Sequence, residues 1–357
     1  MVSRVRPRIA QLVLLLLALL TAHSPAPAAG KPARGSRAAV ITGPCLERSQ
    51  SAMDDVLSIV AASRGNVTDT ARASAALDLA FAETARLDGV FALAGGTSEL
   101  AHLNRIAAEQ RVPCSADLYA ALEAATALAD ETDGAYDPTN GPLLRAWDQR
   151  SGTRAPDAVD LAEARRLTGW RLLALDPGNR TARFARQGME VALGAIARGV
   201  VLERAADLLR QRGIARARLE LGGDVLAFTT HDAWSAAIPG PSDDGRAVMT
   251  LMVSNGAVGT ARSGRGGAAR VLDPRTGQLP LGEASVTVVQ RSALRVRAVA
   301  EALLVRGRDH AETYASAHPE TGVLWLEPLD GGVRAWAWNL GRLATEPGVR
   351  VEWMTKP

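Results

Sequence analysis

One stretch, residues 191–224, constrains the fold more than any other part of the sequence. At its start, apolar side chains alternate with small or polar ones over residues 189–193, as on one face of a strand. Apolar residues then recur at helical spacing over residues 200–209, and Gly213 stands where a left-handed helix end is expected. A second alternating run covers residues 215–221. The stretch therefore predicts a strand, a helix and a strand joined by glycine turns.

The predicted helix opens with small residues, which suggests a ligand. Between Gly194 and Gly199 these residues would let an anion approach the backbone N–H groups at the start of the helix. Arg198 adds a positive charge, so phosphate is the anion that the arrangement favours. A tight connection without a ligand would explain the same glycines, and both interpretations stay open. No Lys, Ser or Thr directly follows Gly199, which excludes a Walker P-loop.

The N-terminal residues are typical of a targeting segment rather than of a folded domain. Three arginines precede an apolar run over residues 12–20, and Ala26-Pro27-Ala28 offers a small-residue cleavage site. We predict a secretory signal peptide over residues 1–30, a flexible tail over residues 31–44 and a single domain over residues 45–357. The protein is then exported to the periplasm or cell envelope, with no stable transmembrane segment once the leader is cleaved. An uncleaved membrane anchor is the alternative.

The leader also accounts for the positive charge of the chain. The formal net charge is +3, and residues 1–30 contain three arginines and no acidic residue. The mature chain is therefore close to neutral, which argues against a nucleic-acid partner. Export permits a disulfide, so the sequence favours, without requiring, a bridge between its two cysteines, Cys45 and Cys114.

The remaining pattern predicts an α+β fold with mixed or antiparallel sheets flanked by helices. The predicted helices cover residues 70–91, 115–132, 155–170 and 292–307. The predicted strands of one partly antiparallel sheet cover residues 225–228, 234–238 and 248–253. The glycine-rich residues 256–267 are predicted to form a loop.

Four separate motifs, taken together, resemble the ApbE-like FAD:protein FMN transferases. They are Asp-Gly-Ala-Tyr-Asp-Pro-Thr ending in Gly-Pro-Leu (residues 133–143), Leu-Gly-Ala-Ile-Ala-Arg-Gly (193–199), Gly-Gly-Asp (222–224) and Asp-Pro-Arg-Thr-Gly (273–277). Their order and spacing are similar too, over roughly residues 53–307. The resemblance implies the two-lobed α+β fold of that family, FAD and Mg²⁺ as ligands, and transfer of FMN to a Thr or Ser of an exported partner protein with release of AMP.

The resemblance also implies where the ligand lies. The implied FAD contacts are Met53, Ala135, Tyr136, Asp137, Gly194, Arg198, Gly223, Asp224 and Leu272. Of these, residues 135–137 would hold the flavin end and the turn at residues 194–199 would hold the phosphates. Asp273 and Arg270 occupy the positions implied for catalysis.

The sequence departs from the family pattern at the base and metal positions. The family's His, three residues ahead of Asp273, is replaced by Arg270, so a base is missing. In the family, Mg²⁺ is held by a backbone carbonyl, here that of Ala197, and by an Asp and a Thr on a helix, here Arg297 and Glu301. A guanidinium repels a dication, so Mg²⁺ binding is not expected at Arg297.

Two further departures accompany these. The family's Met-Gly-Thr is here Met53-Asp54-Asp55, and its Thr-Ser-Gly is disrupted over residues 260–264. We expect Arg297 to replace the charge of the metal by pairing with Glu301 or with a ligand phosphate. A solvated ion pair of Arg297 and Glu301 on one helix face is the alternative.

Three functions stay open on this basis. The chain is an active flavin transferase with weakened activity, a catalytically degenerate FAD-binding or partner-binding protein, or an exported scaffold without flavin. The motifs that would position a ligand are kept, whereas the base and the Lewis acid are not.

Overall fold

The computed structural model describes residues 44–62, 67–148, 156–242, 246–263, 271–341 and 343–355, all within one compact unit, Gly35–Pro357. The predicted signal peptide, the predicted tail up to residue 43, and Arg270 lie outside the described residues. Within the described ranges, every helix is too short or too polar to cross a bilayer.

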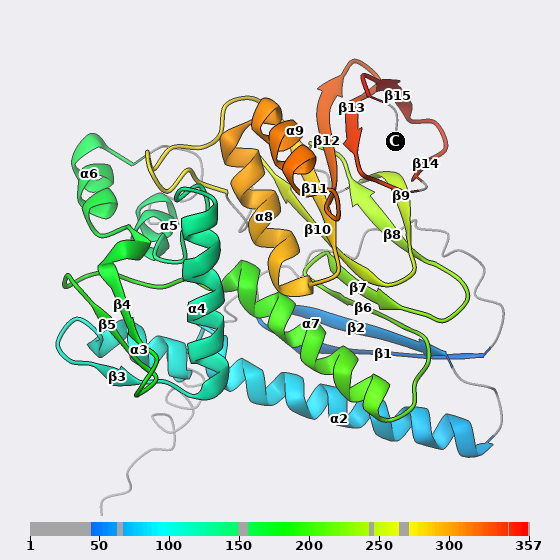
Figure 1. Ribbon diagram of the computed structural model, residues 1–357, viewed down its shortest axis with the longest axis horizontal. Coiled ribbons are helices and arrows are strands. Elements are labelled where there is room, and N and C mark those ends of the chain that lie inside the picture. The colour runs from blue at the N-terminus through cyan, green and yellow to red at the C-terminus, as the bar shows by residue number, and fades with distance from the viewer. Residues whose placement is uncertain are drawn as a thin grey trace, which may run out of the picture. The chain divides into compact units, whose positions relative to one another are not determined.

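A large sheet forms the centre of the fold (Figure 1). Among the described residues it has nine strands, and neighbouring strands run antiparallel except the last pair, which is parallel. In spatial order the strands are β1 (Cys45–Ala52), β2 (Asp55–Ala62), β6 (Ala217–Leu221), β7 (Asp224–Phe228), β10 (Gly256–Arg262), β11 (Ser285–Gln290), β12 (Gly322–Leu329), β13 (Gly332–Trp338) and β15 (Arg350–Trp353).

Helices cover one face of this sheet and enclose the main core (Figure 1). The three that pack there are α2 (Val67–Phe91), α7 (Gly194–Gln211) and α8 (Ala293–Arg306). α8 lies directly over β10 and β11, and α9 (Arg308–Ala317) follows it. Apolar residues at helical spacing in α8, such as Val296, Val299 and Leu303, are buried in this core, as the sequence predicts.

The opposite face of the large sheet is covered by a second, smaller sheet. Its described strands are β14 (Leu343–Thr345), β9 (Ala247–Val253) and β8 (Trp234–Pro239). The prediction that β7, β8 and β9 share one sheet was therefore wrong. Every residue of β7 is buried, because Leu226 and Phe228 face the helices while Val225 and Ala227 face the second sheet. A strand with two apolar faces needs a layer on each side, and β8 and β9 supply one of them.

The remaining elements lie together beside α7 and α8. The helices are α3 (Glu99–Ile106), α4 (Ala116–Glu131), α5 (Gly141–Asp148), α6 (Ala158–Arg166) and the short 3₁₀ helix η1 (Trp170–Leu172). A third sheet contains β3 (Val112–Pro113), β5 (Thr181–Phe184) and β4 (Leu173–Asp176). The predicted α+β class, with mainly antiparallel sheets flanked by helices, is confirmed.

Two backbone predictions were wrong, each for an identifiable reason. Residues 189–193 are not a strand; instead the Asn104 side chain acts as the partner, donating to the Val191 carbonyl and accepting from the Val191 amide, both at 2.9 Å. The first part of the predicted glycine loop is the central strand β10. Gly259 suits this strand because a Cβ there would lie 2.8 Å from the Arg297 backbone nitrogen of α8.

The favoured disulfide is absent from the described residues, where Cys45 and Cys114 are both thiols. Cys45 begins β1 in the large sheet, whereas Cys114 directly follows β3 in the third sheet. The buried Cys114 thiol donates to the Val112 carbonyl at 3.5 Å. Burial raises the pKa of this thiol to about 11.

Candidate functional site

Two hairpin turns meet the start of α7 at one end of the large sheet. Gly222 and Gly223 form a two-residue turn between β6 and β7, and both adopt positive φ (59° and 81°), as this turn type requires. Met53 and Asp54 form the equivalent turn between β1 and β2, with φ of 53° and 61°. Left-handed backbone at two non-glycine residues is strained, and such strain is concentrated at functional sites.

α7 begins at Gly194, so the small residues of this motif form its first helical turns rather than a loop. Leu193 occupies the N-cap and offers no capping side chain. A Cβ on Gly194 would meet no atom within 4 Å, which leaves the helix start open to a ligand. Gly199 has a different role, because a Cβ there would lie 2.3 Å from the Leu294 Cα of α8. It permits the close packing of two helices and does not face a ligand.

A small cavity of about 110 Å³ opens at this helix start. Its walls include four residues predicted from the sequence: Met53, Gly194, Ala197 and Arg198. The Met53 amide donates to Asp88 Oδ1 at 2.8 Å, which fixes the strained turn against α2. Asp54, Phe91, Ala92, Leu93 and Leu193 complete the lining and were not predicted as site residues. Phe91, Ala92 and Leu93 lie at or directly after the end of α2, so their place in the lining depends on how α2 packs, which no local pattern reports.

A buried ion-pair cluster lies next to the Gly222-Gly223 turn. Arg297 of α8 donates from Nε to Asp224 Oδ1 at 2.9 Å, from Nη2 to the Gly222 carbonyl at 3.0 Å, and from Nη1 to the Thr260 carbonyl. Arg198 Nε lies 3.6 Å from the other oxygen of Asp224. Asp224 is 1% exposed; burial raises the pKa of its carboxyl, and the two guanidinium groups oppose that shift. The predicted residues Gly223, Asp224, Arg198 and Arg297 are thus brought together.

The expected pairing of Arg297 with Glu301 was wrong. Within the described residues Glu301 forms no ion pair, and the Arg297 side chain is only 13% exposed, which also excludes the solvated surface pair. Arg297 reaches the ends of β7 and β10 instead, because α8 packs directly over β10. Burial raises the pKa of Glu301 to about 7, against the opposing effect of Arg297 and Arg198.

Two buried polar atoms of the predicted FAD contacts lack hydrogen-bond partners among the described residues. They are the Tyr136 hydroxyl and Arg198 Nε. Burial raises the pKa of Tyr136 well above its usual value, and the carboxylates of Glu301 and Asp137 add to the shift. Ala135 beside it is 2% exposed. Buried polar groups in proteins are almost always hydrogen-bonded, so these atoms are suited to a ligand that brings acceptors or donors.

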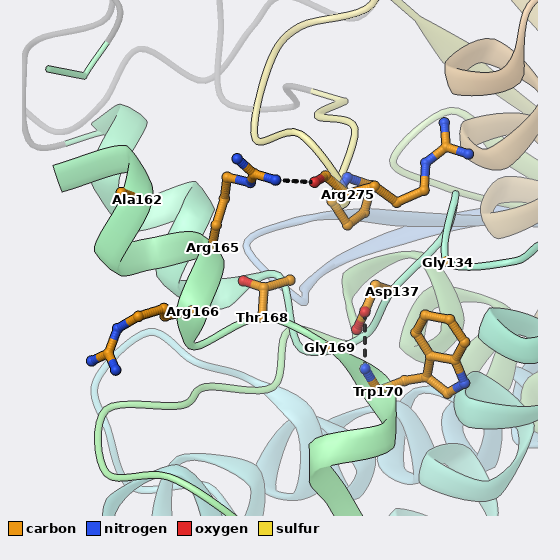
Figure 2. Close-up of a pocket in the computed structure, with 10 residues that line it drawn as sticks. Gly134, Asp137, Ala162, Arg165, Arg166, Thr168, Gly169, Trp170 and Arg275 are labelled. Atoms are coloured by element: carbon orange, nitrogen blue, oxygen red, sulfur yellow. Dashed lines mark hydrogen bonds between the residues drawn. The ribbon is translucent and has the colours of Figure 1, made fainter. Parts of the chain in front are cut away.

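A larger cavity of about 410 Å³ lies between α6, η1 and the turn that contains Arg275 (Figure 2). Its lining includes Gly134, Asp137, Arg165, Thr168, Trp170 and Arg275. Arg165 Nη2 donates to the Arg275 carbonyl at 3.0 Å across this cavity, as Figure 2 shows. An indole and several guanidinium groups suit a flat ring and an anion.

Asp137 uses its carboxylate to hold the protein together. It accepts from the Thr139 amide at 2.8 Å, from the Thr139 hydroxyl at 2.6 Å and, as Figure 2 shows, from the Trp170 amide at 2.9 Å. Burial raises the pKa of Asp137, and these three hydrogen bonds oppose the shift. The side chain therefore shapes the wall of the larger cavity rather than presenting unused acceptors to it.

The Asp-Pro-Arg-Thr-Gly motif forms a rigid turn at the edge of the same cavity. Asp273 accepts from the Arg275 amide at 3.0 Å and pairs with the Arg275 side chain at 2.9 Å, while the Gly277 amide donates to the Asp273 carbonyl at 2.7 Å. Leu272 is buried in a cluster with Leu143 and Trp147. Within the described residues, the Asp273 carboxylate thus has Arg275 as its ion-pair partner. A catalytic role for Asp273 or Arg270 stays a prediction.

Comparison with known proteins gives the family. The profile of the ApbE family matches residues 53–325. The chain belongs to the ApbE family. It is 30% identical over 258 residues to an FAD:protein FMN transferase of Vibrio cholerae, covering 67% of this chain and 75% of that relative. It is also 30% identical over 160 residues to one of Klebsiella pneumoniae, covering 44% of this chain and only 50% of the relative.

Solved ApbE structures share the fold. The flavin transferase ApbE of Vibrio cholerae superposes with a TM-score of 0.70 at 24% identity, covering 83% of this chain and 98% of that one. The ApbE protein of Thermotoga maritima gives a TM-score of 0.69 at 23% identity, covering 85% and 97%.

Magnesium does not fit the site as this member of the ApbE family presents it. Arg297 has only N–H donors and cannot ligate a metal. Its guanidinium already contacts Asp224 and two backbone carbonyls, the kind of oxygen atoms that Mg²⁺ requires. FAD does fit, because the start of α7 is open and uncapped. Among the described residues, Arg198 Nε and the Tyr136 hydroxyl also have no hydrogen-bond partner, and a phosphate or a flavin group can supply one.

Proposed function

We propose that this protein is an FAD:protein FMN transferase that moves FMN from FAD to a Thr or Ser of an exported partner, with release of AMP. The observation that carries the proposal is the meeting of Met53, Gly194, Ala197 and Arg198 in one cavity at the uncapped start of α7. The family match and the transferase relatives support the same activity.

The reaction places a clear demand on the site. The acceptor hydroxyl oxygen attacks the phosphorus on the FMN side of the diphosphate, the bond from that phosphorus to the bridging oxygen breaks, and AMP leaves with the bridging oxygen. The hydroxyl proton passes to solvent water. The diphosphate must therefore be held in line with the acceptor while its negative charge is balanced. The start of α7 and Arg198 provide a positive environment for that charge.

The flavin ring is assigned to the larger cavity. Asp137 shapes that cavity, Trp170 is part of its lining, and Arg275 contributes a positive charge. Tyr136 is next to Asp137 in the chain, and burial together with the Glu301 and Asp137 carboxylates raises the pKa of its hydroxyl. FAD in this arrangement extends from the flavin at Trp170 to the phosphates at Arg198.

A second candidate is an FAD-binding protein with little turnover. The specific observation in its favour is that Arg297 fills the position of a metal ligand with a guanidinium that the protein itself neutralises. Arg270 stands where the resemblance expects a base, and it lies outside the described residues. Positioning without a base or a Lewis acid gives binding with slow transfer.

One pair of measurements separates these functions. The purified mature protein is mixed with FAD, and the visible absorption spectrum of the flavin is recorded. A periplasmic extract is then added, and AMP release is followed. Finally, the proteins of the extract are tested for covalently bound flavin by its fluorescence. The proposed transferase shifts the flavin spectrum, releases AMP and labels an acceptor. A shifted spectrum without AMP indicates the binding protein, and an unchanged spectrum rules out both.

Arg198→Ala and Arg204→Ala form a matched pair for the same assay. Both arginines belong to α7, but Arg204 is 55% exposed and pairs with Asp117 away from the cavity. Loss of one phosphate contact should weaken FAD binding about tenfold or more in Arg198→Ala. Arg204→Ala should bind FAD as the unmodified protein does.

A further inference from the structure

We propose that Arg297 is a built-in replacement for a divalent cation, so that this protein binds the FAD diphosphate without Mg²⁺. The inference rests on the proposed function for its ligand. Arg297 stands where the resemblance to the family implies an Asp that ligates Mg²⁺.

The surroundings of Arg297 are those of a bound cation. One carboxylate oxygen of Asp224 and two backbone carbonyls, from Gly222 and Thr260, converge on its guanidinium. Oxygen donors of this kind suit a hard cation such as Mg²⁺. Here they accept hydrogen bonds from an organic cation that is permanently charged and covalently part of α8.

The guanidinium retains hydrogen-bonding capacity for a ligand. Arg carries five N–H donors, and each of its three nitrogens gives one hydrogen bond to the protein, which leaves two N–H groups. Gly223 beside it has no side chain, and a Cβ there would lie 3.9 Å from Arg297 Nη2. Gly223 therefore places no side chain next to this nitrogen, and 13% of the Arg297 side chain is exposed.

The position of Arg297 is set by close backbone packing. Gly259 of β10 lets the α8 backbone approach so near that a Cβ would lie 2.8 Å from the Arg297 nitrogen. This contact holds the helix where the side chain reaches both the β6–β7 turn and β10. A dication placed at the same oxygen atoms would be repelled by the guanidinium, so the two cations exclude one another.

A purely structural ion pair is the competing explanation, and FAD titrations distinguish the two. FAD is titrated into the mature protein, in Mg²⁺ or in EDTA, and binding is followed by flavin fluorescence. The unmodified protein should have the same Kd in both buffers to within about twofold, and Arg297→Gln should bind about tenfold more weakly or worse in EDTA. Arg295→Gln is the control, because Arg295 lies on the same helix, is 34% exposed and pairs with Glu131. It should change neither Kd.

A second measurement does not require FAD. Mg²⁺ is titrated calorimetrically into the flavin-free protein and into Arg297→Asp, after circular dichroism has established that each is folded. The unmodified protein should give no binding heat, whereas Arg297→Asp, which adds a carboxylate among Asp224 and the two carbonyls, should bind Mg²⁺. Should Arg297→Asp fail to fold, Arg297→Gln in the same titration tests whether removing the guanidinium admits the metal.

The outcomes test separately whether Arg297 replaces Mg²⁺ and whether the protein has the proposed FAD-dependent function. If the unmodified protein binds FAD only with Mg²⁺, or binds Mg²⁺ by itself at this site, Arg297 is not a replacement cation. Wild-type affinity of Arg297→Gln for FAD in EDTA makes the arginine purely structural and overturns the inference as well. If FAD does not bind in either buffer, the proposed function is wrong. The inference that Arg297 replaces Mg²⁺ in FAD binding is then wrong too.

Discussion

The Asp224 carboxylate holds the Arg297 guanidinium at 2.9 Å across the tip of the β6–β7 turn. Asp224 is the first residue of β7 and Arg297 belongs to α8, so this contact joins the central sheet to the helix that covers it. Because Asp224 is 1% exposed and also faces Arg198, its charge balances two arginines from different helices.

Replacing Asp224 should therefore destabilise the fold strongly. Asp224→Asn leaves the partly buried Arg297 without its counter-charge, and loss of one partner of a buried pair typically costs about 3–5 kcal/mol. Urea unfolding of the flavin-free protein measures the change. Asp130→Asn is the control. The Asp130 side chain is 71% exposed, and its ion pair with Arg171 should contribute less than about 1 kcal/mol to stability. Equal, small effects in both variants would contradict the buried pair.

The two glycines of the α7 motif should differ in their response to alanine. Gly199→Ala places a Cβ 2.3 Å from the Leu294 Cα, so α7 and α8 must move apart, and overpacking of this kind costs about 1–3 kcal/mol or more. In Gly194→Ala nothing lies within 4 Å of the new atom, and stability should change by less than about 1 kcal/mol. Thermal unfolding of both flavin-free variants checks this. A Gly199→Ala protein as stable as Gly194→Ala would exclude close packing of the helices there.

The Tyr136 hydroxyl should contribute to FAD binding but not to the stability of the flavin-free protein. Its hydroxyl is buried without a partner, so Tyr136→Phe should leave the flavin-free protein as stable or more stable by up to about 1 kcal/mol. The same variant should lose part of the rise in melting temperature that FAD gives. In Tyr314→Phe, the removed hydroxyl bonds to Glu131 at 3.2 Å, and this control should be destabilised instead. The reverse order of stability would show that Tyr136 already has a protein partner.

Cys114 should react slowly with alkylating reagents. With a pKa of about 11, only about one molecule in a thousand carries the thiolate at pH 8, and the rate should rise about tenfold per pH unit up to that pKa. Iodoacetamide labelling followed by mass spectrometry of peptides gives the rate at each pH. Unfolding in denaturant should make Cys114 react like an ordinary thiol. Failure of either cysteine to react after unfolding without a reductant would indicate a disulfide after all.

The same burial has a consequence for stability. The pKa of Cys114 is raised in the folded protein above its ordinary value of 9.0. The unfolded chain therefore loses this proton first as the pH rises, and the free energy of unfolding falls between pH 9.0 and about 11. Below pH 9 the contribution of this group should be constant.

Local patterns allowed much of the fold to be predicted. Ser115 caps α4 by accepting from the Leu118 amide at 3.2 Å, and capping together with helical periodicity placed this helix to within a residue at each end. The paired glycines 222 and 223 likewise predicted a turn, because glycine adopts positive φ without strain. Both signals are contained within a few neighbouring residues.

Contacts set by tertiary packing could not be predicted in this way. On α8 itself, Glu301 is the visible partner for Arg297 at the i+4 position, whereas the actual partner Asp224 is 73 residues away in the sequence. Gly259 suggested a loop, although it lies in a central strand because α8 approaches it closely. For the site, local motifs gave four of the nine residues that line the α7 cavity but not Phe91. They gave the residues of the ion-pair cluster but not the pairing of Arg297 with Asp224.

The burial of β7 on both faces has a consequence for the way the site responds to its ligand. Asp224 lies on a strand whose neighbours β6 and β10 are both hydrogen-bonded to it, under a helix layer and above a second sheet. Amides in such a strand exchange with solvent only through near-global opening of the protein. The arginine cluster is therefore assembled by folding itself, and the proposed ligand would meet a preformed site instead of organising one.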